Sequence, residues 1–285
     1  MLVPQGGETR VIDIHSHILG GVDDGSADSI VSMQMLREAS AAGVKAIVAT
    51  PHSGSDRISL RTDGIIRRVK ELASLAADDK LASQVNIIPG AEIMLDPGVP
   101  QMVADGLLPC LGAKGRYVLV EIPMLQVPPY TDDVLFDLVA RGFTPILAHP
   151  ERNHELSEKL DMVYDIIGRG CLMQLEAGSL VGRYGPEAQA AAWRMLEHNM
   201  GHFLASDAHS PRTYRSVLPE AIEEARRQLG DERAHELFHA NAEAVLEGRR
   251  PDVAPPIRPG CSANNKKTGI ISRFQKWWGK QDLNL

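Results

Sequence analysis

The chain has 285 residues, a formal net charge of −7 and 44% hydrophobic residues, which suits one large α/β barrel or two smaller domains and argues against nucleic-acid binding as the main function. The three cysteines, Cys110, Cys171 and Cys261, are too few and too scattered to predict a disulfide framework. Because the sequence also lacks an apolar leader and any run near the roughly 18 apolar residues of a membrane span, we expect a cytoplasmic protein.

Seven short apolar runs predict β-strands. In chain order they are residues 10–17, 45–52, 85–93, 117–123, 144–151, 171–178 and 202–209. The segments between them carry apolar residues at helical spacing, such as Val31, Met35 and Ala39, and we expect helices there. Glycines are expected to stop these helices before the next strand, at Gly43, Gly142, Gly170 and Gly201. This alternation predicts parallel strands, either in a doubly wound sheet or in a closed barrel.

Side chains that could bind metal occur at the carboxyl ends of six of these strands. They are His15, His17, His52, Glu92, Glu121, His149, Asp207 and His209. An open sheet would gather a site mainly at one crevice, whereas a barrel brings the carboxyl ends of all its strands around one mouth. The distribution therefore favours a barrel, with seven recognisable strands.

The first strand ends in an H-x-H pair, His15 and His17. Because alternate residues of a strand point to the same side, we expect Asp13, His15 and His17 to face the barrel interior. Imidazole and carboxylate together suit Mn²⁺, Fe²⁺ or Zn²⁺. Asp13 lies one layer deeper, where we expect it to orient a histidine rather than to bind metal.

Two adjacent acids, Asp23 and Asp24, lie in the glycine-containing loop after this strand. Such pairs usually form only a solvated turn, and Ser26 or Asp28 is expected to cap the following helix. Beside the H-x-H pair, one of the two aspartates becomes a candidate ligand. Nine ligands are too many for one ion, so we expect two or three ions that share carboxylates and activate water for attack on a phosphoester.

The motifs DIHSHILGGVDDG, ATPH, GAEI, VEIP, AHPER and SDAH resemble, in order and spacing, those of the polymerase and histidinol phosphatase (PHP) superfamily. More narrowly, they resemble its capsule-type bacterial tyrosine phosphatases, the CpsB/CapC group. The resemblance covers residues 11 to about 250. It implies a distorted (β/α)₇ TIM-like barrel domain over residues 1–250 and a trinuclear site that usually holds Mn²⁺, with Fe²⁺ or Zn²⁺ as alternatives.

Carried over position by position, the resemblance implies a role for each ligand. The first ion is matched by His15, His17, Glu92 and Asp207; the second by Glu121 and His149 with Glu92 as a bridge; the third by Asp24, His52 and His209. Arg152 in AHPER matches an arginine that binds or polarises the phosphate. For a second such arginine we take Arg212, with Arg215 as the alternative.

Two other motifs outline different sites. Cys110 and Arg116 form a C-x₅-R pattern, but Arg116 leads into a strand, and a phosphatase cysteine needs a helix N-terminus there. The H-E-x-x-H pattern at residues 235–239 lies beyond the last strand, where we expect a solvated helix face rather than a zinc site. Three further histidines are expected to be structural: His154, His198 and His202.

The resemblance implies hydrolysis of phosphotyrosine. The partner it implies is the tyrosine-rich tail of a bacterial tyrosine autokinase that controls capsule or exopolysaccharide assembly. A small substrate such as histidinol phosphate, and a non-catalytic metal-binding module, remain as alternatives, and the oligomeric state stays open. Amidohydrolases commonly have a lysine at the end of the fourth strand, where this chain has Glu121.

Residues 251–285 differ in composition from the rest. From Pro251 the chain is rich in proline, asparagine and glycine, which is typical of a linker. Further on, Ile270, Phe274 and Trp277 fall on one side of a basic helix. Such a helix can lie at an anionic membrane interface, so we weigh peripheral contact of residues 266–280 with the inner face of the membrane against packing on the barrel or a frayed end.

Overall fold

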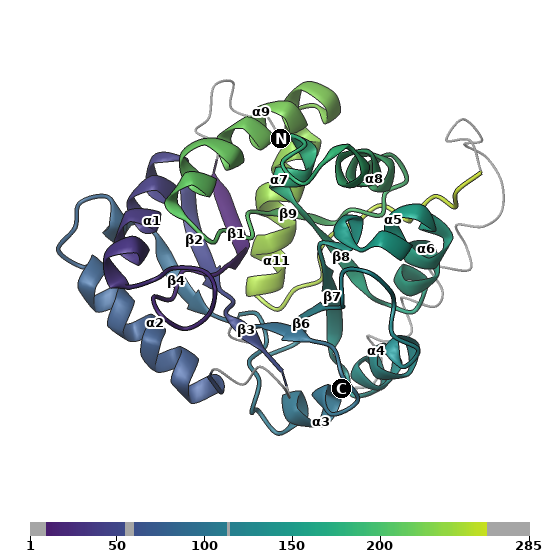
Figure 1. Cartoon of the computed structure of the whole chain (residues 1–285), viewed down its shortest axis with the longest axis horizontal. Coiled ribbons are helices and arrows are strands. Elements are labelled where there is room, and N and C mark those ends of the chain that lie inside the picture. The colour runs from purple at the N-terminus through teal and green to yellow at the C-terminus, as the bar shows by residue number, and fades with distance from the viewer. Residues whose placement is uncertain (1–9, 55–59, 113–114, 261–285) are drawn as a thin grey trace.

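The computed structural model describes residues 10–54, 60–112 and 115–260. The strands of this part are β1 (Val11–Ser16), β2 (Val44–Ala49), β3 (His52–Ser53), β4 (Asn86–Pro89), β5 (Glu92–Met94), β6 (Tyr117–Glu121), β7 (Thr144–Ala148), β8 (Leu172–Glu176) and β9 (Phe203–Ala205). They pair in parallel, in one sheet of order β1-β2-β4 and another of order β3-β5-β6-β7-β8-β9. Helices surround these strands (Figure 1).

Two of the predicted strands are each interrupted once. Pro51, which has no N–H to donate to a sheet, lies between β2 and β3, and Gly90 and Ala91 lie between β4 and β5. The N–H of Gly90 donates to the carbonyl of Ala49 (3.0 Å), and that of Glu92 donates to the carbonyl of Pro51 (3.2 Å). Because pairing continues across both breaks, the nine short strands make up the seven predicted from the sequence.

The barrel closes between β1 and the end of β9. Just beyond β9, the N–H of Asp207 donates to the carbonyl of His15 (3.0 Å), and the N–H of His17 donates to the carbonyl of Ala208 (3.0 Å). A sheet that closes in this way lacks the open crevice that is typical of a doubly wound fold. The predicted distorted (β/α)₇ TIM-like barrel is therefore confirmed.

Helices and single helical turns follow the strands. In the described part they are α1 (Ser29–Ala41), α2 (Thr62–Ala76), η1 (Ala82–Gln84), α3 (Val99–Ala104), α4 (Thr131–Ala140), η2 (Pro150–Arg152), α5 (His154–Glu158), α6 (Leu160–Gly168), α7 (Ala177–Leu180), α8 (Pro186–Glu197), η3 (Thr213–Val217), α9 (Leu218–Leu229), α10 (Asp231–His235), η4 (Glu236–Ala240) and α11 (Asn241–Leu246). Of the turns, η1 and η2 are 3₁₀-helical, whereas η3 and η4 are π-helical turns within longer helical runs.

Helix α1 forms as its sequence predicts. Asp28 caps it, because its Oδ1 accepts the N–H groups of Ile30 (2.8 Å) and Val31 (2.9 Å). Ser26 instead donates its hydroxyl to the carbonyl of Asp28. Of the two candidate caps, the structure therefore selects Asp28.

The predicted glycine stops are left-handed in three of four cases. Gly43, Gly142 and Gly170 have φ angles of 85°, 89° and 101°, which glycine adopts without strain. After α8 the left-handed residue is Asn199 (φ 54°), not Gly201. Gly201 is needed for close packing, because a Cβ there would lie 2.7 Å from a methyl group of Leu175.

Two apolar clusters fill the fold, one inside the barrel and one between the strands and the helices. Along β6, Tyr117 and Leu119 belong to the inner cluster, whereas Val118 and Val120 belong to the outer one. Because Glu121 has the same phase as Tyr117 and Leu119, this alternation turns its carboxylate into the barrel mouth.

Asp13 departs from the predicted orientation. The pairing of β1 with β2 shifts register between Asp13 and Ser16, and Ile14 packs in the inner cluster. The carboxylate of Asp13 accepts hydrogen bonds from the Ser206 N–H (2.9 Å) and the Tyr214 hydroxyl (2.8 Å). Asp13 therefore ties β1 to β9 and η3, and the expectation that it orients a histidine ring is wrong.

Residues 251–260, at the start of the predicted linker, contain no helix or strand but pack on the barrel. The N–H of Ile257 donates to the carbonyl of His198 (2.7 Å), and Arg258 pairs with Asp161 (3.1 Å). The domain boundary at residue 250 stays a prediction, and residues 266–280 lie outside the described residues. Within the described ranges, no helix combines the length and the hydrophobicity needed to cross a bilayer.

Candidate metal centre

Nine side chains expected to bind metal meet at the carboxyl end of the barrel. They are His15, His17, Asp24, His52, Glu92, Glu121, His149, Asp207 and His209, and each has a nitrogen or oxygen within 3.4 Å of another member. Eight of them lie at or just beyond the carboxyl ends of the strands predicted from the sequence, and one lies in the loop before α1. The convergence of strand ends in a closed barrel is what brings together residues so far apart in sequence.

The deepest group surrounds two histidines, His15 in β1 and His17 directly after that strand. Oε2 of Glu92 lies 3.3 Å from Nε2 of both His15 and His17, and Oδ1 of Asp207 lies 3.3 and 3.2 Å from the same nitrogens. The two Nε2 atoms are 3.3 Å apart. Neighbouring donors on one ion, each about 2.0–2.2 Å from it, stand about 3 Å apart, so this spacing fits a shared cation.

Two side chains orient these histidines. Nδ1 of His15 lies 2.7 Å from Oε1 of Gln174, and Nδ1 of His17 lies 2.8 Å from Oδ2 of Asp23. Because both oxygens are acceptors, the ring protons belong on Nδ1, which leaves Nε2 free to bind metal. Asp23 therefore braces a ligand, and Asp24 is the member of the acidic pair that faces other histidines.

Glu92 links this group to a second one. Its Oε1 lies 2.8 Å from Nε2 of His149, while its Oε2 lies 3.0 Å from Nδ1 of His52. The same Nδ1 lies 3.1 Å from Oε1 of Glu121. A carboxylate with one oxygen toward each group is suited to bridge two ions.

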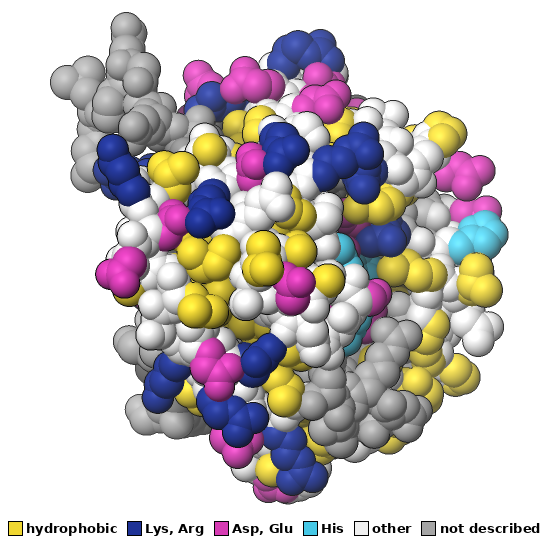
Figure 2. All heavy atoms as spheres, turned by 60° about the vertical axis from the view of Figure 1, so that its left-hand side comes forward, with side chains coloured by type: hydrophobic (Ala, Val, Ile, Leu, Met, Phe, Trp, Pro, Cys, Tyr) yellow, Lys and Arg dark blue, Asp and Glu magenta, His cyan; other side chains and the backbone are white. Residues whose placement is uncertain are grey.

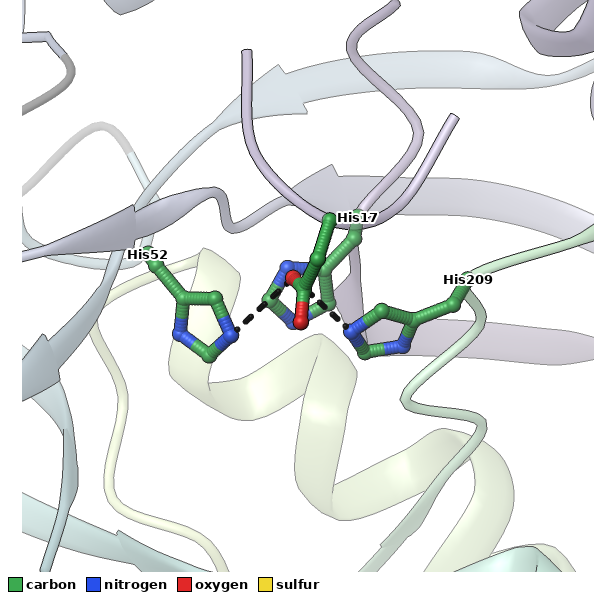
Figure 3. A group of neighbouring side chains, drawn as sticks. His17, His52 and His209 are labelled. Carbon is green, nitrogen blue, oxygen red and sulfur yellow. Dashed lines mark ion pairs between the residues drawn. The ribbon is translucent and has the colours of Figure 1, made fainter. Parts of the chain in front are cut away.

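A third group lies nearest the solvent. Oδ1 of Asp24 lies 3.3 Å from Nε2 of His52 and 3.4 Å from Nε2 of His209, the two contacts drawn as dashed lines in Figure 3. The ring of His17 lies behind them and stacks on that of His209, with centroids 4.0 Å apart. His52 thus offers one ring nitrogen to each of the two outer groups.

The donors fit cations. Oε2 of Glu92 and Oδ1 of Asp207 are buried and receive no hydrogen bond from the part of the chain that the structure describes. Burial lowers the pKa of His15, but the carboxylates of Glu92 and Asp207 outweigh it and raise that pKa to about 9. Such buried negative charge needs protons or metal ions beside it, and borderline nitrogen and oxygen donors suit Mn²⁺, Fe²⁺ and Zn²⁺ alike.

Two of the candidate ligands have a strained backbone. His149 and Asp207 have φ angles of 35° and 46°, in the left-handed region that few residues other than glycine adopt. Such conformations cost about 1–3 kcal/mol each and gather at functional sites. Hydrogen bonds hold both in place: the N–H of His149 donates to the carbonyl of Gln174 (2.8 Å), and that of Asp207 donates to the carbonyl of His15 (3.0 Å).

Arg152 lies at the edge of the cluster. Its Nη1 lies 2.8 Å from Oε2 of Glu176 and 3.2 Å from Oδ2 of Asp207, and its guanidinium lies 4.2 Å from the centre of the Tyr184 ring. The side chain is 24% exposed and lines the pocket above the ligands. It can therefore contact both a ligand and an anion bound in the pocket.

The alternatives for a second arginine lie farther out. Arg215 is bound to Glu38 of α1, with Nη2 and Oε1 2.6 Å apart. Arg212 is exposed and is not among the residues that line the pocket. The contact with Glu38 argues against Arg215, and the role of Arg212 stays a prediction.

Four supporting residues were missed in the sequence analysis, although two of them carry a local signal. Gln174 and Glu176 share one phase of β8, and Glu176 ends that strand as the candidate ligands end theirs. Oε1 of Glu151 accepts the N–H of Glu176 (2.8 Å), so it fixes the strand end that carries this carboxylate. The contact of Tyr184 with Arg152 has no such local signal, because it comes from the loop before α8.

Neither of the two other motifs forms a site within the residues that the structure describes. Burial raises the pKa of the Cys110 thiol to about 11, and the residue after it pairs with Tyr117 instead of starting a helix. His235 and His239 stack on each other on α10 and η4, and neither lines the pocket of the candidate ligands. His202 is buried and its Nδ1 accepts the N–H of Met173 (2.8 Å), which is a structural role.

The ligands lie at the bottom of a pocket of about 690 Å³. Figure 2 shows histidine side chains recessed in a hollow of the surface, with basic, acidic and hydrophobic side chains beside them. The lining includes Asp24, His52, His209, Arg152 and residues 122–126. An anionic group that entered the pocket would meet the metal ligands and Arg152 together.

A family comparison agrees with this geometry. The model of the family described as "Capsular polysaccharide synthesis, CpsB/CapC" matches residues 11–247. The chain belongs to the CpsB/CapC family. The matched range contains all nine candidate ligands and the residues that orient them.

Relatives of this CpsB/CapC protein are named as tyrosine phosphatases. It is 34% identical to the tyrosine-protein phosphatase YwqE of Bacillus subtilis over 252 residues, which are 86% of this chain and 95% of the relative. It is 28% identical to the tyrosine-protein phosphatase CpsB of Streptococcus agalactiae over 242 residues, which are 83% and 98% of the two chains.

A solved structure supports the likeness. It comes from work on YwqE of Bacillus subtilis and CpsB of Streptococcus pneumoniae, described there as unique metal-dependent tyrosine phosphatases. It matches with a TM-score of 0.79 at 33% identity, over 86% of this chain and 98% of that one. Both fold and sequence therefore place the barrel in this family.

Proposed function

We infer that this CpsB/CapC protein is a metal-dependent tyrosine-protein phosphatase of capsular polysaccharide synthesis. The observation that carries the inference is the cluster of nine ligand-type side chains with Arg152 at its edge. Its support is the agreement with relatives that are named tyrosine-protein phosphatases. The substrate class, a phosphomonoester of tyrosine, follows from that likeness.

We propose that the site holds two or three ions, with Mn²⁺ as the first candidate and Fe²⁺ or Zn²⁺ as alternatives. The distances favour one ion at His15, His17, Glu92 and Asp207. A second would lie at Glu121 and His149, with Glu92 as the bridge, and a third at Asp24, His52 and His209. His52 faces both outer groups, with Nε2 toward Asp24 and Nδ1 toward Glu121.

The chain's own residues bind and orient the substrate. When bound, the ions supply acidity for water at neutral pH and draw charge from the phosphate oxygens. Arg152 would bind a non-bridging oxygen and take up charge in the transition state. Glu176 and Tyr184 hold its guanidinium from two sides. A tyrosine leaving group ionises near pH ~10, so it needs less help from a general acid than an alkyl alcohol would.

The proposed partner is the tyrosine-rich tail of a bacterial tyrosine autokinase. The pocket opens at the surface, so it can accept a phosphorylated side chain from an extended segment. A small phosphomonoester such as histidinol phosphate is the alternative substrate, and a non-catalytic metal-binding module is the alternative of another class. Cytoplasmic location, with or without peripheral membrane contact, belongs to the same proposal.

One experiment tests the proposed function. The protein is stripped of metal, re-supplied with Mn²⁺ and given phosphotyrosine peptide, phosphoserine peptide and histidinol phosphate in parallel. We expect fast hydrolysis of the phosphotyrosine peptide alone, and the same rate in a Cys110→Ser variant. Preferred hydrolysis of histidinol phosphate would replace the substrate, and no hydrolysis by metal-loaded protein would favour the binding module.

A further inference from the structure

Large apolar side chains are exposed at one side of the pocket. The segment after β6, residues 122–126, lines the same pocket as the candidate ligands. Within it Met124 is 37% exposed and Leu125 is 77% exposed. The other large apolar side chains exposed in the described residues, Ile30, Leu75, Leu81 and Phe136, do not line the pocket. We call the apolar residues 122–125 of this segment the apolar ledge.

The backbone of the apolar ledge is fixed by α5 and the residue before it. The Asn153 amide donates to the carbonyl of Pro123 (2.7 Å), and the N–H of His154 donates to the carbonyl of Met124 (2.8 Å). On the far side, Oε2 of Glu155 accepts the N–H of Val127 (3.0 Å). Because these contacts hold the main chain, the exposure of Leu125 is a property of the fold and not of a frayed loop.

Apolar lining is confined to one sector of the pocket. It comes from Met94 at the end of β5 and from the apolar ledge at the end of the neighbouring strand β6. The rest of the lining is polar or charged: Asp24, His52, Glu92, Glu121, Gln126, His149, Arg152, Asp207 and His209. A ligand with an anionic head and an apolar body therefore has one orientation in which its head meets the charged lining and its body meets the apolar sector.

Resting on the proposed phosphatase function, we propose that Met124 and Leu125 bind the phenyl ring of the substrate phosphotyrosine while the ligands and Arg152 bind its phosphate. Glu121 immediately precedes the ledge, so the distance between the phosphate and the ring surface is set by the chain itself. Flexible Met and Leu side chains pack well on an aromatic face. A phosphoserine would bring its polar main chain to the same surface, which it cannot desolvate without loss.

The test uses two inhibitors that differ only in the ring. Benzylphosphonate and methylphosphonate are measured as competitive inhibitors of Mn²⁺-loaded protein, as wild type and as Leu125→Ser and Met124→Ser variants. Leu75→Ser on α2 is the matched control, because Leu75 is 56% exposed but lies outside the pocket. Thermal melts and metal content verify that each variant is folded and loaded.

We expect the wild type to bind benzylphosphonate more tightly than methylphosphonate. Leu125→Ser should reduce that preference about three- to tenfold, and Met124→Ser should reduce it less, while Leu75→Ser leaves it unchanged. The Ki of methylphosphonate should stay the same throughout. Replacing Leu125 by Phe, which keeps the apolar surface, should retain the preference.

Other results would overturn the proposal. One such result is that Leu125→Ser prefers benzylphosphonate over methylphosphonate as strongly as the wild type does. Another is that the wild type shows no preference for benzylphosphonate. A loss confined to peptide substrates would place the contact on residues beside the phosphotyrosine and contradict the ring assignment. If the wild type fails to hydrolyse phosphotyrosine peptide, the proposed function fails; if it hydrolyses the peptide and the preference is insensitive to Leu125, only the ledge fails.

Discussion

Arg152 and Asp207 are in contact, with Nη1 and Oδ2 3.2 Å apart, so the arginine proposed to bind phosphate also touches a proposed metal ligand. The other oxygen of Asp207 faces His15 and His17. One carboxylate thus fixes the position of the arginine relative to the ions. The proposed phosphate-binding arginine and the proposed metal ligands therefore share one carboxylate. Substitutions of individual residues can distinguish phosphate binding from metal binding.

Arg152→Ala should lower kcat/KM for a phosphotyrosine peptide by about 10- to 1,000-fold, because one charge-stabilising donor is lost. Metal content should remain at the wild-type level, since Arg152 binds the oxygen of Asp207 that faces away from the histidines. Steady-state kinetics and metal analysis measure the two effects. Unchanged kinetics would move the role to Arg212.

Glu176→Gln should lower kcat/KM about tenfold while it leaves metal content unchanged, because the amide retains the shape of the side chain but replaces the carboxyl oxygen that lies 2.8 Å from Nη1 of Arg152. In an Arg152→Ala background the same substitution should have little further effect, since its role is to position that arginine. A double-mutant cycle on kcat/KM measures this. Additive losses would show that Glu176 acts independently of Arg152.

Removal of individual ligands should have graded effects. Glu92→Ala should reduce bound metal most and abolish hydrolysis, because Glu92 contacts histidines of two groups from a fully buried position. Asp24→Ala should lose only the outermost ion, because Asp24 is exposed and contacts His52 and His209 of the outermost group. Metal analysis after dialysis compares the two. Equal loss in both would contradict the division into groups.

His202 should make stability sensitive to acid. Burial, with a smaller effect of Arg233, lowers its pKa to about 3, whereas in the unfolded chain it is about 6.5. Below pH 6.5 the unfolded state binds a proton that the folded state does not, so the free energy of unfolding falls as the pH decreases from 6.5 toward 3. The slope for this group approaches about 1.4 kcal/mol per pH unit.

His202→Asn retains an acceptor near the position of Nδ1 but cannot titrate. The variant should therefore lose less stability than the wild type between pH 7 and pH 5, by about 1–2 kcal/mol. Urea unfolding at both pH values measures the difference, in which the contributions of all other groups cancel. Parallel pH profiles would show that His202 does not drive the acid sensitivity.

The tail, which lies outside the described residues, can be tested by deletion. Removing residues 264–285 should leave hydrolysis of a small aryl phosphate unchanged, because every proposed ligand precedes Ser210. If the basic segment at 266–280 contacts membrane, only the full-length chain should float with anionic vesicles at low salt. Absence of flotation by the full-length protein would rule out the membrane contact.

The barrel and the positions of the candidate ligands could be read from the sequence. Alternation along β6 and the H-x-H pair of His15 and His17 are local patterns, and parallel strands in a closed barrel bring their carboxyl ends to one mouth whatever the loops do. This convergence of strand ends can be predicted without knowing any distance between strands. That is why residues as far apart in sequence as His15 and His209 could be assigned to one site.

Only the tertiary structure decided how that site is braced. Gln174, rather than Asp13, orients His15, and the carboxylate of Asp13 accepts a hydrogen bond from Tyr214 instead. Side chains 159 positions apart meet in the contact of His15 with Gln174, and no local pattern encodes such a pair. Strand identity follows from local periodicity, whereas the partner of each polar side chain depends on packing that exists only once the barrel has closed.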